Sequence, residues 1–461
     1  MREDKDSLGA VSIPEGALYS SNSVRGAENF RLIGRPISAY PNFVSTMAKV
    51  KKAAALANLR ANALAPELAD AITAACDEII VGNHHDNFIV ALAEGSGGTS
   101  INMNFNEVIA NRAGQILGDP LGSFKRVNPN DHVNMSQSTN DVIPTAVKLA
   151  CVVGGMPLID AATELVLAFR AKAEQYRMVL RLGRTCMQAA QPMTYGQLFD
   201  GYAATLERAV GHLNEARIGL QAVPMGGTAI GTGLGAAAGY HDHIATTLSE
   251  EFGTVISLPD DYFDAMQAAD GFSRFSGELK ILSETIGKIA GDLVILGSGD
   301  NSGLGEIALP SVQPGSSIMA GKVNPVICMM VQQVAFMVHG NDATVSIAAL
   351  SGQMEINHFE PVMAHALFSS LDLLTNGCTI FRIKCIAELA VNEERSYANL
   401  VSSFAISTVF LRQLGYKRVS ELVTNSTTKG ISLAENIVEE GLMTPEEVKR
   451  SLVAATQGAV I

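Results

Sequence analysis

The sequence has no tryptophan, few other aromatic residues and little charge. Of its 461 residues, 6% are aromatic, 17% are charged and 47% are hydrophobic. A chain of this composition can bury a large core, which excludes intrinsic disorder. Low charge combined with abundant alanine predicts helices buried on more than one face, as in a bundle or the interior of an oligomer. Because the length exceeds what one core usually supports, we expect about three structural units.

An excess of basic residues is absent as well. The chain has 33 Lys and Arg against 46 Asp and Glu, a formal net charge of −13. Without a basic face, neither nucleic acid nor an anionic membrane is expected as a partner, although a local pocket can still bind a small anion. No run reaches the roughly 18 uninterrupted apolar residues of a membrane span, and the charged start lacks a signal-peptide core. We therefore expect a soluble protein.

Closely spaced cysteines and complete metal-ligand sets are also missing. The scattered cysteines predict a reducing compartment, so we expect the cytoplasm. The segments His84-His85-Asp86 and His241-Asp242-His243 lack the cysteine or carboxylate cluster that would complete a metal site, and we expect none. The six cysteines are Cys76, Cys151, Cys186, Cys328, Cys378 and Cys385.

Apolar residues recur every three to four positions along most of the chain, which predicts a mainly α fold. Helices are expected over 45–80 with a break at Pro66, and over 201–223, 326–347 and 361–389. The only strand-like runs are VSIP near the start and GTVISLP from Gly253. The clearest helical seam steps by three and four through Leu279, Leu282, Ile286, Ile289, Leu293 and Leu296, and Ile281 and Ile295 widen its apolar surface.

The helical pattern shortens after Ala390. Shorter helices are expected over 402–414, 431–440 and 444–452, which indicates a small C-terminal helical domain. We predict an N-terminal mainly helical domain over 1–140, a central helix-bundle domain over 141–391 and the C-terminal domain over 392–461.

Three polar segments interrupt the apolar helical sequence: Gly97–Ser100, Ser136–Asn140 and Gly315–Pro325. Hydroxyl, amide and backbone N–H donors ahead of helices, together with Lys322, are the parts of a carboxylate-binding site. Taken singly, each segment is more often a helix cap or a turn, so spacing alone leaves both interpretations open. A fourth segment, GGTAIGTG from Gly226, lacks the Lys-Ser/Thr ending of a phosphate loop and is expected to connect two helices.

The third segment resembles the signature G-S-x-x-M-x-x-K-x-N of the fumarase/aspartase superfamily. Similar stretches cover almost the whole chain, including NMNFNEVIANRA from Asn102, GLGEIALP from Gly303 and EEGLMTPEEV from Glu439. The resemblance implies a three-domain, mainly α fold with a central five-helix bundle. It also implies a homotetramer whose active sites are each built from three subunits, with no metal or cofactor in the chemistry. The signature's fixed positions are filled by Gly315, Ser316, Met319, Lys322 and Asn324.

The resemblance further implies a lyase that acts on a small dicarboxylate. Reversible anti-elimination from a succinyl compound, aspartate or an aspartate derivative, would give fumarate plus ammonia or an amine. Ser316 would be the base that removes the β-proton. The implied binding residues are Lys322, Asn324 and Ser317 for the α-carboxylate, Thr99, Ser138 and Thr139 for the β-carboxylate, and Asn140 and Thr185 for the leaving group.

These residue types suit the chemistry. A C–H beside an ionised carboxylate is very weakly acidic, so the intermediate is an aci-carboxylate dianion that only fixed donors can stabilise. A serine base must become an alkoxide, which the loop N–H groups around Gly315 and Gly321 and the nearby Lys322 would favour. The glycines suit a loop that closes over substrate.

Two positions depart from the family pattern. Cys186 stands where the family usually has histidine, and Met329 where many members have the glutamate that pairs with it. Since no base lies close to Cys186 in sequence, we expect a small pocket-lining residue rather than a nucleophile. The change makes the leaving-group end less polar, so the exact substrate stays open. A fumarate hydratase and a non-catalytic family member are the alternatives, and the loop with Thr99 favours C–N over C–O cleavage.

Overall fold

The structure is a computed structural model that describes residues 1–31, 34–299 and 302–457. It is mainly helical, as the sequence predicts. The chain forms two compact units, each assembled from separate stretches of sequence. The predicted domain boundaries at 140 and 391 stay predictions. Unit 1 contains Met1–Ile159, Gly211–Ile281 and Met337–Leu374, and unit 2 contains Asp160–Val210, Leu282–Phe336 and Thr375–Ile461.

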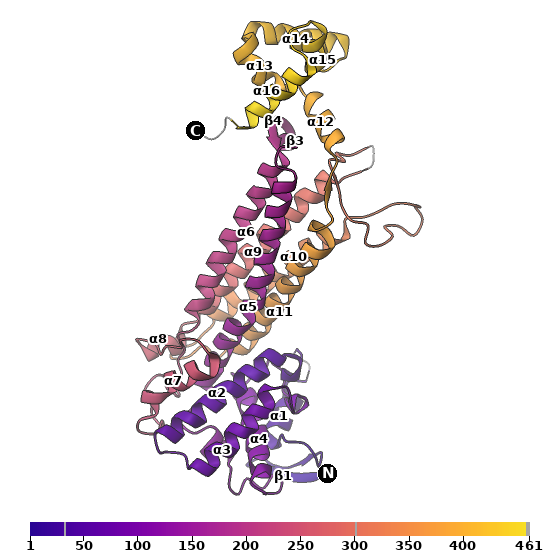
Figure 1. Ribbon diagram of the computed structural model, residues 1–461. Coiled ribbons are helices and arrows are strands. Elements are labelled where there is room, and N and C mark those ends of the chain that lie inside the picture. The colour runs from indigo at the N-terminus through magenta and orange to yellow at the C-terminus, as the bar shows by residue number, and fades with distance from the viewer. Residues whose placement is uncertain (32–33, 300–301, 458–461) are drawn as a thin grey trace. The chain divides into compact units, whose positions relative to one another are not determined.

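Unit 1 holds the N-terminal hairpin and a cluster of helices (Figure 1). Helix α2 packs against α3 and α7, and α4 packs against α1 and α3. The ring centroids of Phe105 on α4 and Phe88 lie 4.2 Å apart, and Phe105 is fully buried. The elements are β1 (Arg2–Asp6), β2 (Gly9–Ile13), α1 (Ser21–Asn29), α2 (Pro41–Arg60), α3 (Pro66–Ile80), α4 (Thr99–Ile116), α7 (Tyr240–Phe252) and α8 (Tyr262–Gln267).

Five long helices contain the points where the chain passes between the units. In unit 2 the aromatic ring of Phe169 on α5 lies 6.3 Å between centroids from Phe199 on α6 and from Phe381 on α11. In unit 1 Ser276 of α9 donates to Asp342 of α10. The helices are α5 (Thr139–Gln175), α6 (Tyr195–Gly219), α9 (Asp270–Leu296), α10 (Val326–Leu350) and α11 (Glu360–Phe381), close to the predicted ranges.

The predicted seam on α9 is confirmed, since its six residues from Leu279 to Leu296 are all buried. Ile281 and Ile295 lie beside it but stay 41% and 39% exposed in this chain. One helix among the described residues, α5, is long and apolar enough to cross a membrane, but 67% of its most apolar window is buried inside the chain. That burial is what the core helix of a bundle has.

The C-terminal part of unit 2 is built from short helices and two short strand pairs. A hairpin, β3 (Leu180–Thr185) with β4 (Gln188–Thr194), adds Leu180 and Leu182 to the core formed by Leu400, Phe410 and Leu422. Strand β5 (Ile307–Ala308) pairs with β6 (Ala390–Val391). The helices are α12 (Glu393–Val401), α13 (Ser407–Leu414), α14 (Tyr416–Lys429), α15 (Leu433–Glu439) and α16 (Pro445–Gln457).

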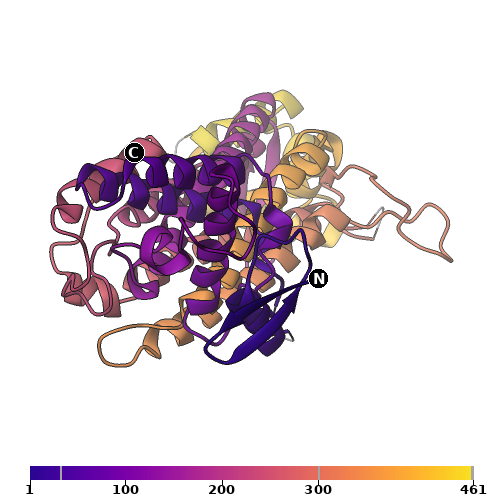
Figure 2. The same cartoon turned by 90° about the horizontal axis from the view of Figure 1, so that it is seen from below.

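Single-turn helices complete the fold, and Figure 2 shows the cartoon from the end that carries the N-terminal hairpin. Three are 3₁₀ turns, and two are π turns, which in proteins are frequent near functional sites. They are η1 (Ile37–Ala39), η2 (His85–Asn87) and η5 (Phe404–Ile406), and the π turns η3 (Pro129–Val133) and η4 (Arg382–Ile386).

The strand predictions were partly wrong. VSI lies in β2 as expected, but GTVISLP from Gly253 is no strand, and only Ser257 forms an isolated bridge with Ala222. Within the described part of the chain, the segment makes only the two backbone–backbone hydrogen bonds of this bridge, from Val223 N–H to the Ser257 carbonyl and from Ser257 N–H to the Gln221 carbonyl, and Val255 stays 77% exposed. The hairpin β3–β4 was not predicted, because Gly183 and Pro192 are residues that strands disfavour.

Candidate active-site elements

The polar segment before α5 is fixed by a buried carboxylate. Asp141 is fully buried, and its Oδ1 accepts the backbone N–H of Ser138 at 2.8 Å. Its Oδ2 accepts the N–H groups of Gly226 and Thr228, both at 3.0 Å. Burial raises the pKa of Asp141 to about 7, while the three N–H groups oppose that rise. One side chain therefore joins the start of α5 to the glycine-rich connection that follows α6, which confirms the connection expected at Gly226.

The buried side chain of Lys51 also holds the polar segment before α5 in place. Lys51 of α2 is fully buried, and its Nζ donates to Asn102 Oδ1 at 2.7 Å, Asn134 Oδ1 at 3.1 Å and Gln137 Oε1 at 2.8 Å. Burial lowers the pKa of Lys51 to about 7. Asn102 in turn donates to Thr139 Oγ1 at 3.2 Å. Lys51 thus ties α2 to both helix starts that carry predicted β-carboxylate residues.

The start of α4 lies against the start of α5. Gly97 and Gly98 have φ of +67° and +90°, and Glu94 accepts the N–H of Gly98. A Cβ on Gly98 would meet Ile143 Cγ1 at 2.8 Å, so only glycine permits this approach. Thr99 is the first residue of α4 and is exposed.

Unit 1 therefore brings four predicted residues together: Thr99, Ser138, Thr139 and Asn140 lie at two helix N-termini. Such ends offer free N–H donors and a favourable dipole to an anion. Asn140 already donates its Nδ2 to the Ala229 carbonyl at 2.8 Å, so its Oδ1 is the atom left for a leaving group.

Unit 2 carries Thr185 and Cys186 at the tip of the hairpin β3–β4. Thr185 pairs with Gln188, and the two residues between them, Cys186 and Met187, have φ of +49° and +63°. A two-residue turn with both φ positive matches the strand twist but normally takes Asn or Gly. Both side chains are exposed. The tip is thus a strained turn, of a kind that is concentrated at functional sites.

Unit 2 also carries the serine loop, residues 315–325, between β5 and α10. Its neck is closed by two hydrogen bonds, Gly315 N–H to the Lys322 carbonyl at 2.8 Å and Asn324 Nδ2 to the Gly315 carbonyl at 2.7 Å. A Cβ on Gly315 would lie 2.5 Å from the Lys322 oxygen, so this crossing requires glycine. The loop holds the predicted Ser317 and Lys322 on its exposed surface.

The Ser316 hydroxyl has a distinctive environment within this loop. Its Oγ accepts the backbone N–H groups of Met319 at 2.9 Å and Ile318 at 3.2 Å. Donors aimed at an oxygen favour its anionic form. Lys322 lies in the same loop. The geometry can therefore support an alkoxide at Ser316.

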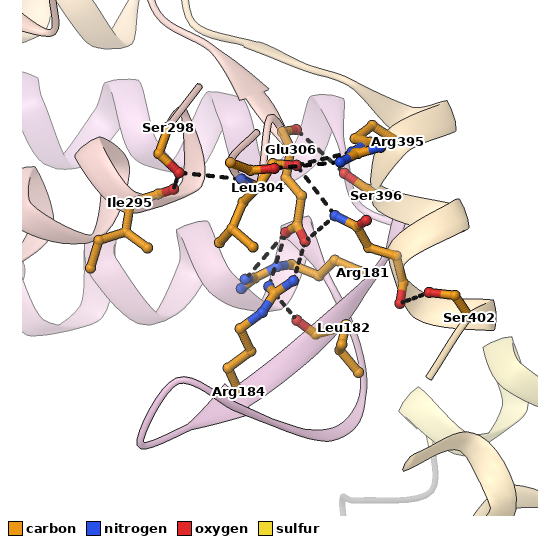
Figure 3. A network of polar contacts seen from close by, with 12 residues as sticks. Arg181, Leu182, Arg184, Ile295, Ser298, Leu304, Glu306, Arg395, Ser396 and Ser402 are labelled. Atoms are coloured by element: carbon orange, nitrogen blue, oxygen red, sulfur yellow. Dashed lines mark hydrogen bonds and ion pairs between the residues drawn. The ribbon is translucent and has the colours of Figure 1, made fainter. Parts of the chain in front are cut away.

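A buried network joins the hairpin to the segment that leads into the serine loop (Figure 3). At its centre is Glu306, which is fully buried and precedes β5. Its carboxylate binds the Arg184 guanidinium through both oxygens and accepts Asn399 Nδ2 at 3.0 Å. Arg181 lies 3.7 Å from Glu306 Oε2. Sequence reasoning missed Glu306, although an acid inside the apolar run GLGEIALP is a signal of a buried, paired carboxylate.

The two positions that depart from the family pattern both lie in unit 2. Met329, in the first turn of α10, is 45% exposed, and Cys186 is exposed at the hairpin tip. Neither side chain is enclosed within this chain. The pocket that Cys186 helps to line, of about 340 Å³, also contains Arg181, Arg184 and Lys288.

The histidines considered as metal ligands make ordinary hydrogen bonds. His84 Nε2 lies 2.9 Å from Glu78 Oε2, and His241 Nε2 lies 2.8 Å from the Gly226 carbonyl. Over residues 1–31, 34–299 and 302–457, no group of three His, Cys, Asp or Glu side chains is arranged to hold a metal ion.

Comparison with known proteins identifies the class of this helical protein. Residues 9–340 match the family model described as Lyase. The chain belongs to this lyase family, within the fumarase/aspartase superfamily that the serine-loop signature indicated.

Individual relatives match almost the full length. Aspartate ammonia-lyase from a Bacillus species is 39% identical over 452 residues, 98% of this chain and 96% of the relative. Aspartate ammonia-lyase from Pseudomonas aeruginosa is 40% identical over 443 residues, 96% of this chain and 94% of the relative. The prediction of a carbon–nitrogen lyase agrees with these names.

Solved structures match the fold equally well. The cobalt-bound fumarate lyase:delta crystallin from Brucella melitensis has a TM-score of 0.95 at 40% identity and covers 99% of both chains. The recombinant class II fumarase from Schistosoma mansoni has a TM-score of 0.91 at 31% identity, covering 100% of this chain and 99% of that chain. The predicted fold class is confirmed.

Proposed function

We propose that this protein catalyses the reversible deamination of aspartate to fumarate and ammonia. The observation that carries the proposal is near-complete alignment, at 39–40% identity, with relatives named aspartate ammonia-lyase. The residues that would do the chemistry are present in the segments described above. The proposed substrate, a small dicarboxylate, suits the two helix N-termini of unit 1.

In the proposed mechanism Ser316, as an alkoxide, takes the proton from the aspartate β-carbon. The C–H electron pair moves into the β-carboxylate and gives a dianion, which Thr99, Ser138 and Thr139 stabilise with their hydroxyl and N–H donors. The electron pair then returns to form the C=C bond as the C–N bond to the α-carbon breaks. The protonated amine leaves toward Asn140 and Thr185 as ammonia, and its nitrogen keeps the electron pair of the broken C–N bond.

The α-carboxylate is held by the serine loop in this scheme. Lys322 supplies the positive charge, and Asn324 and Ser317 supply hydrogen bonds. Asn324 already donates Nδ2 to the Gly315 carbonyl, so it contributes to the loop's shape as well as to the substrate contact.

The test is incubation of the purified protein with aspartate while fumarate is followed by its ultraviolet absorbance. We expect fumarate to accumulate, and ammonia plus fumarate to regenerate aspartate. Malate in the same assay tests the hydratase alternative. A folded protein that releases fumarate from neither compound would contradict the proposal and favour a non-catalytic member.

A second candidate substrate is favoured by Cys186 and Met329. Because they replace a polar pair at the leaving-group end, an N-substituted aspartate is the alternative to aspartate itself. A panel of aspartates with small N-substituents, compared by kcat/KM, decides between them. Higher kcat/KM on a substituted compound would overturn aspartate as the preferred substrate.

We further propose a homotetramer with active sites shared between subunits. Exposed apolar residues on α10 support association, since Met329, Phe336 and Ile347 are 45%, 69% and 62% exposed. Phe336 follows Met329 by seven residues and Ile347 follows Phe336 by eleven, a spacing that places all three on one face of the helix. Light scattering after gel filtration measures the mass.

A matched pair of variants tests whether this face associates. Phe336→Glu is expected to dissociate the assembly and abolish turnover. Leu8→Glu, in the exposed turn between β1 and β2, should change neither. An active monomer would contradict shared sites.

For the location of the protein we propose the cytoplasm. The six cysteines are free thiols, and five are buried. Thiol titration of the unfolded protein taken directly from fractionated cells tests this, with six free thiols in the cytosolic fraction as the expected result.

A further inference from the structure

The buried carboxylate of Glu306 lies at the centre of the polar network in Figure 3. We propose that Glu306 is a positioning residue that holds the leaving-group hairpin, residues 180–194, and the root of the serine loop to a single anchor. The proposal rests on the proposed function for its catalytic consequences. Its structural part rests on contacts within unit 2 alone.

The first half of the anchor is the hairpin. Arg184, whose guanidinium binds both Glu306 oxygens, directly precedes Thr185 on β3. Arg181 adds a second cation 3.7 Å from Glu306 and stacks over the Tyr195 ring at 5.2 Å. Arg181 and Glu306 are buried and Arg184 is half-buried, so water screens these charges little.

The second half is the segment that leads to Ser316. The Glu306 N–H donates to the Leu296 carbonyl at 2.9 Å, and its own carbonyl accepts the N–H of Asn392 at 2.9 Å. The next residues form β5, paired with β6, before the chain enters the serine loop. The loop root is therefore fixed on one side to the end of α9 and on the other to the start of α12.

The surrounding residues leave Glu306 little freedom. The Tyr195 hydroxyl lies 3.3 Å from the Glu306 carbonyl and 3.4 Å from Oε2, and it also contacts Ser396 Oγ at 3.1 Å. Asn399 of α12 reaches the other carboxylate oxygen. Burial and the nearby carboxylate raise the pKa of Tyr195 to about 12, so it acts as a donor to Glu306.

The consequence is mechanical coupling between two parts of the candidate site. If the hairpin shifts, the ion pair with Arg184 transmits the shift to Glu306 and so to the segment that leads into the serine loop. If that segment shifts, the same ion pair transmits the shift to Arg184. The coupling depends on the negative charge of Glu306. Glutamine at this position would keep the side-chain volume, but its neutral amide would turn an N–H₂ group toward the guanidinium groups of Arg181 and Arg184. Removing one partner of such a buried pair leaves a charge uncompensated.

The experiment compares Glu306→Gln, Arg184→Gln and the double variant with Glu107→Gln as control. Glu107 is an equally buried glutamate in unit 1, where it accepts N–H groups at the start of α1. Backbone hydrogen exchange is measured on peptides covering 183–189 and 307–325. We expect Arg184→Gln to speed exchange in 307–325, and Glu306→Gln to speed it in 183–189. Glu107→Gln should alter neither peptide.

Kinetics on aspartate supply the second measurement. Because positioning of a base affects the chemical step, kcat should fall about 10- to 100-fold while KM changes less than about threefold. The isotope effect with aspartate deuterated at the β-carbon should rise. The double variant should be no worse than the more impaired single variant, as expected of residues that act as one unit.

The two failures are distinguishable. If exchange in each variant rises only in the mutated segment, or if kcat effects of the single variants multiply in the double, the coupling proposal is wrong. If the wild type releases no fumarate from aspartate, the proposed function is wrong, and the exchange measurement still decides whether Glu306 couples the two segments.

Discussion

The start of α5 and the serine loop carry polar residues of the same kinds, but they are held in opposite ways. Around the start of α5, buried Asp141 and Lys51 bind backbone and amide groups from α4, from the segment before α5 and from the connection after α6. The serine loop bonds mainly to itself, and Ile318 is 88% exposed. Fixed donors suit a developing charge, because they need no reorganisation when it forms. A loop with few buried contacts suits a base that must move aside to admit substrate.

The largest expected effect comes from removing the proposed base in the exposed serine loop. Ser316→Ala should lower kcat by about 10²- to 10⁴-fold, because a general base contributes that much and no packing is lost. Thermal unfolding should match the wild type, and Ser317→Ala, as the neighbouring hydroxyl, should mainly raise KM. Steady-state kinetics and calorimetry measure both. Comparable turnover in Ser316→Ala and wild type would move the base elsewhere.

The next largest effect comes from breaking the fixed side. Lys51→Met should destabilise the protein by about 2–4 kcal/mol, because Asn102 Oδ1 and Gln137 Oε1 lose the ammonium that donates to them, whereas Asn134 Oδ1 keeps its donors Asn102 and Asn106. Its neighbour Lys52 is the matched control, since it is half-buried and its ammonium keeps ion pairs with the carboxylates of Asp77 and Glu251 rather than with buried amides. Lys52→Met should cost less than about 1 kcal/mol. Urea unfolding measures both variants, and equal losses would refute the distinction between the two regions.

A smaller effect is expected at the leaving-group end. Cys186→His with Met329→Glu should raise kcat/KM on aspartate or malate and lower it on the preferred substituted substrate, by about tenfold, or 1.4 kcal/mol. Both side chains are exposed in this chain, so each single variant should unfold at nearly the wild-type temperature. A double-mutant cycle of kcat/KM on these substrates measures the change. If wild type is already efficient on aspartate and the double variant gains nothing, the two departures carry no specificity.

The smallest effect concerns the pH dependence of stability. Burial raises the pKa of Glu360 to about 8, so between about pH 4.5 and 8 the folded chain holds a proton that the unfolded chain has lost. The free energy of unfolding therefore falls as pH rises through that window. Glu360→Gln should remove this fall and be more stable than wild type above pH 8, by about 1 kcal/mol.

Urea unfolding at pH 5 and pH 8.5 measures the difference for Glu360→Gln. The control Glu355→Gln changes an exposed carboxylate in the preceding loop and should follow the wild type at both pH values. A parallel pH dependence of Glu360→Gln and wild type would show that Glu360 is ionised in the folded protein.

Periodic apolar residues made the long helices predictable, because burial on one face imposes a spacing that sequence records directly. Pro66 marked a helix start for a different reason, because proline lacks an N–H and fits the first position of a helix. The hairpin β3–β4 could not be found this way, since its pairing depends on Gly183 fitting against the Gln191 carbonyl. Helix α14 was missed because only a few of its residues are buried.

In the candidate site, too, local sequence patterns were predictable and contacts between distant residues were not. The serine loop was identified because its signature is contiguous, and the structure gives Gly315 the close backbone crossing that its position requires. Lys51 and Glu306 were missed because their partners are distant in sequence. A signal existed for Lys51, which falls four residues from the buried Met47 and Ala55 on the apolar face of α2.

The closed neck at Gly315 has a consequence for timing. Because Gly315 is hydrogen-bonded to Lys322 and Asn324, Ser316 and Lys322 belong to one closed ring of backbone. In the proposed mechanism, the ammonium that neutralises a substrate carboxylate and the hydroxyl that takes its proton would therefore arrive in the same step. A substrate that fails to attract Lys322 would then also fail to meet Ser316, and recognition of charge and commitment to reaction would be a single event.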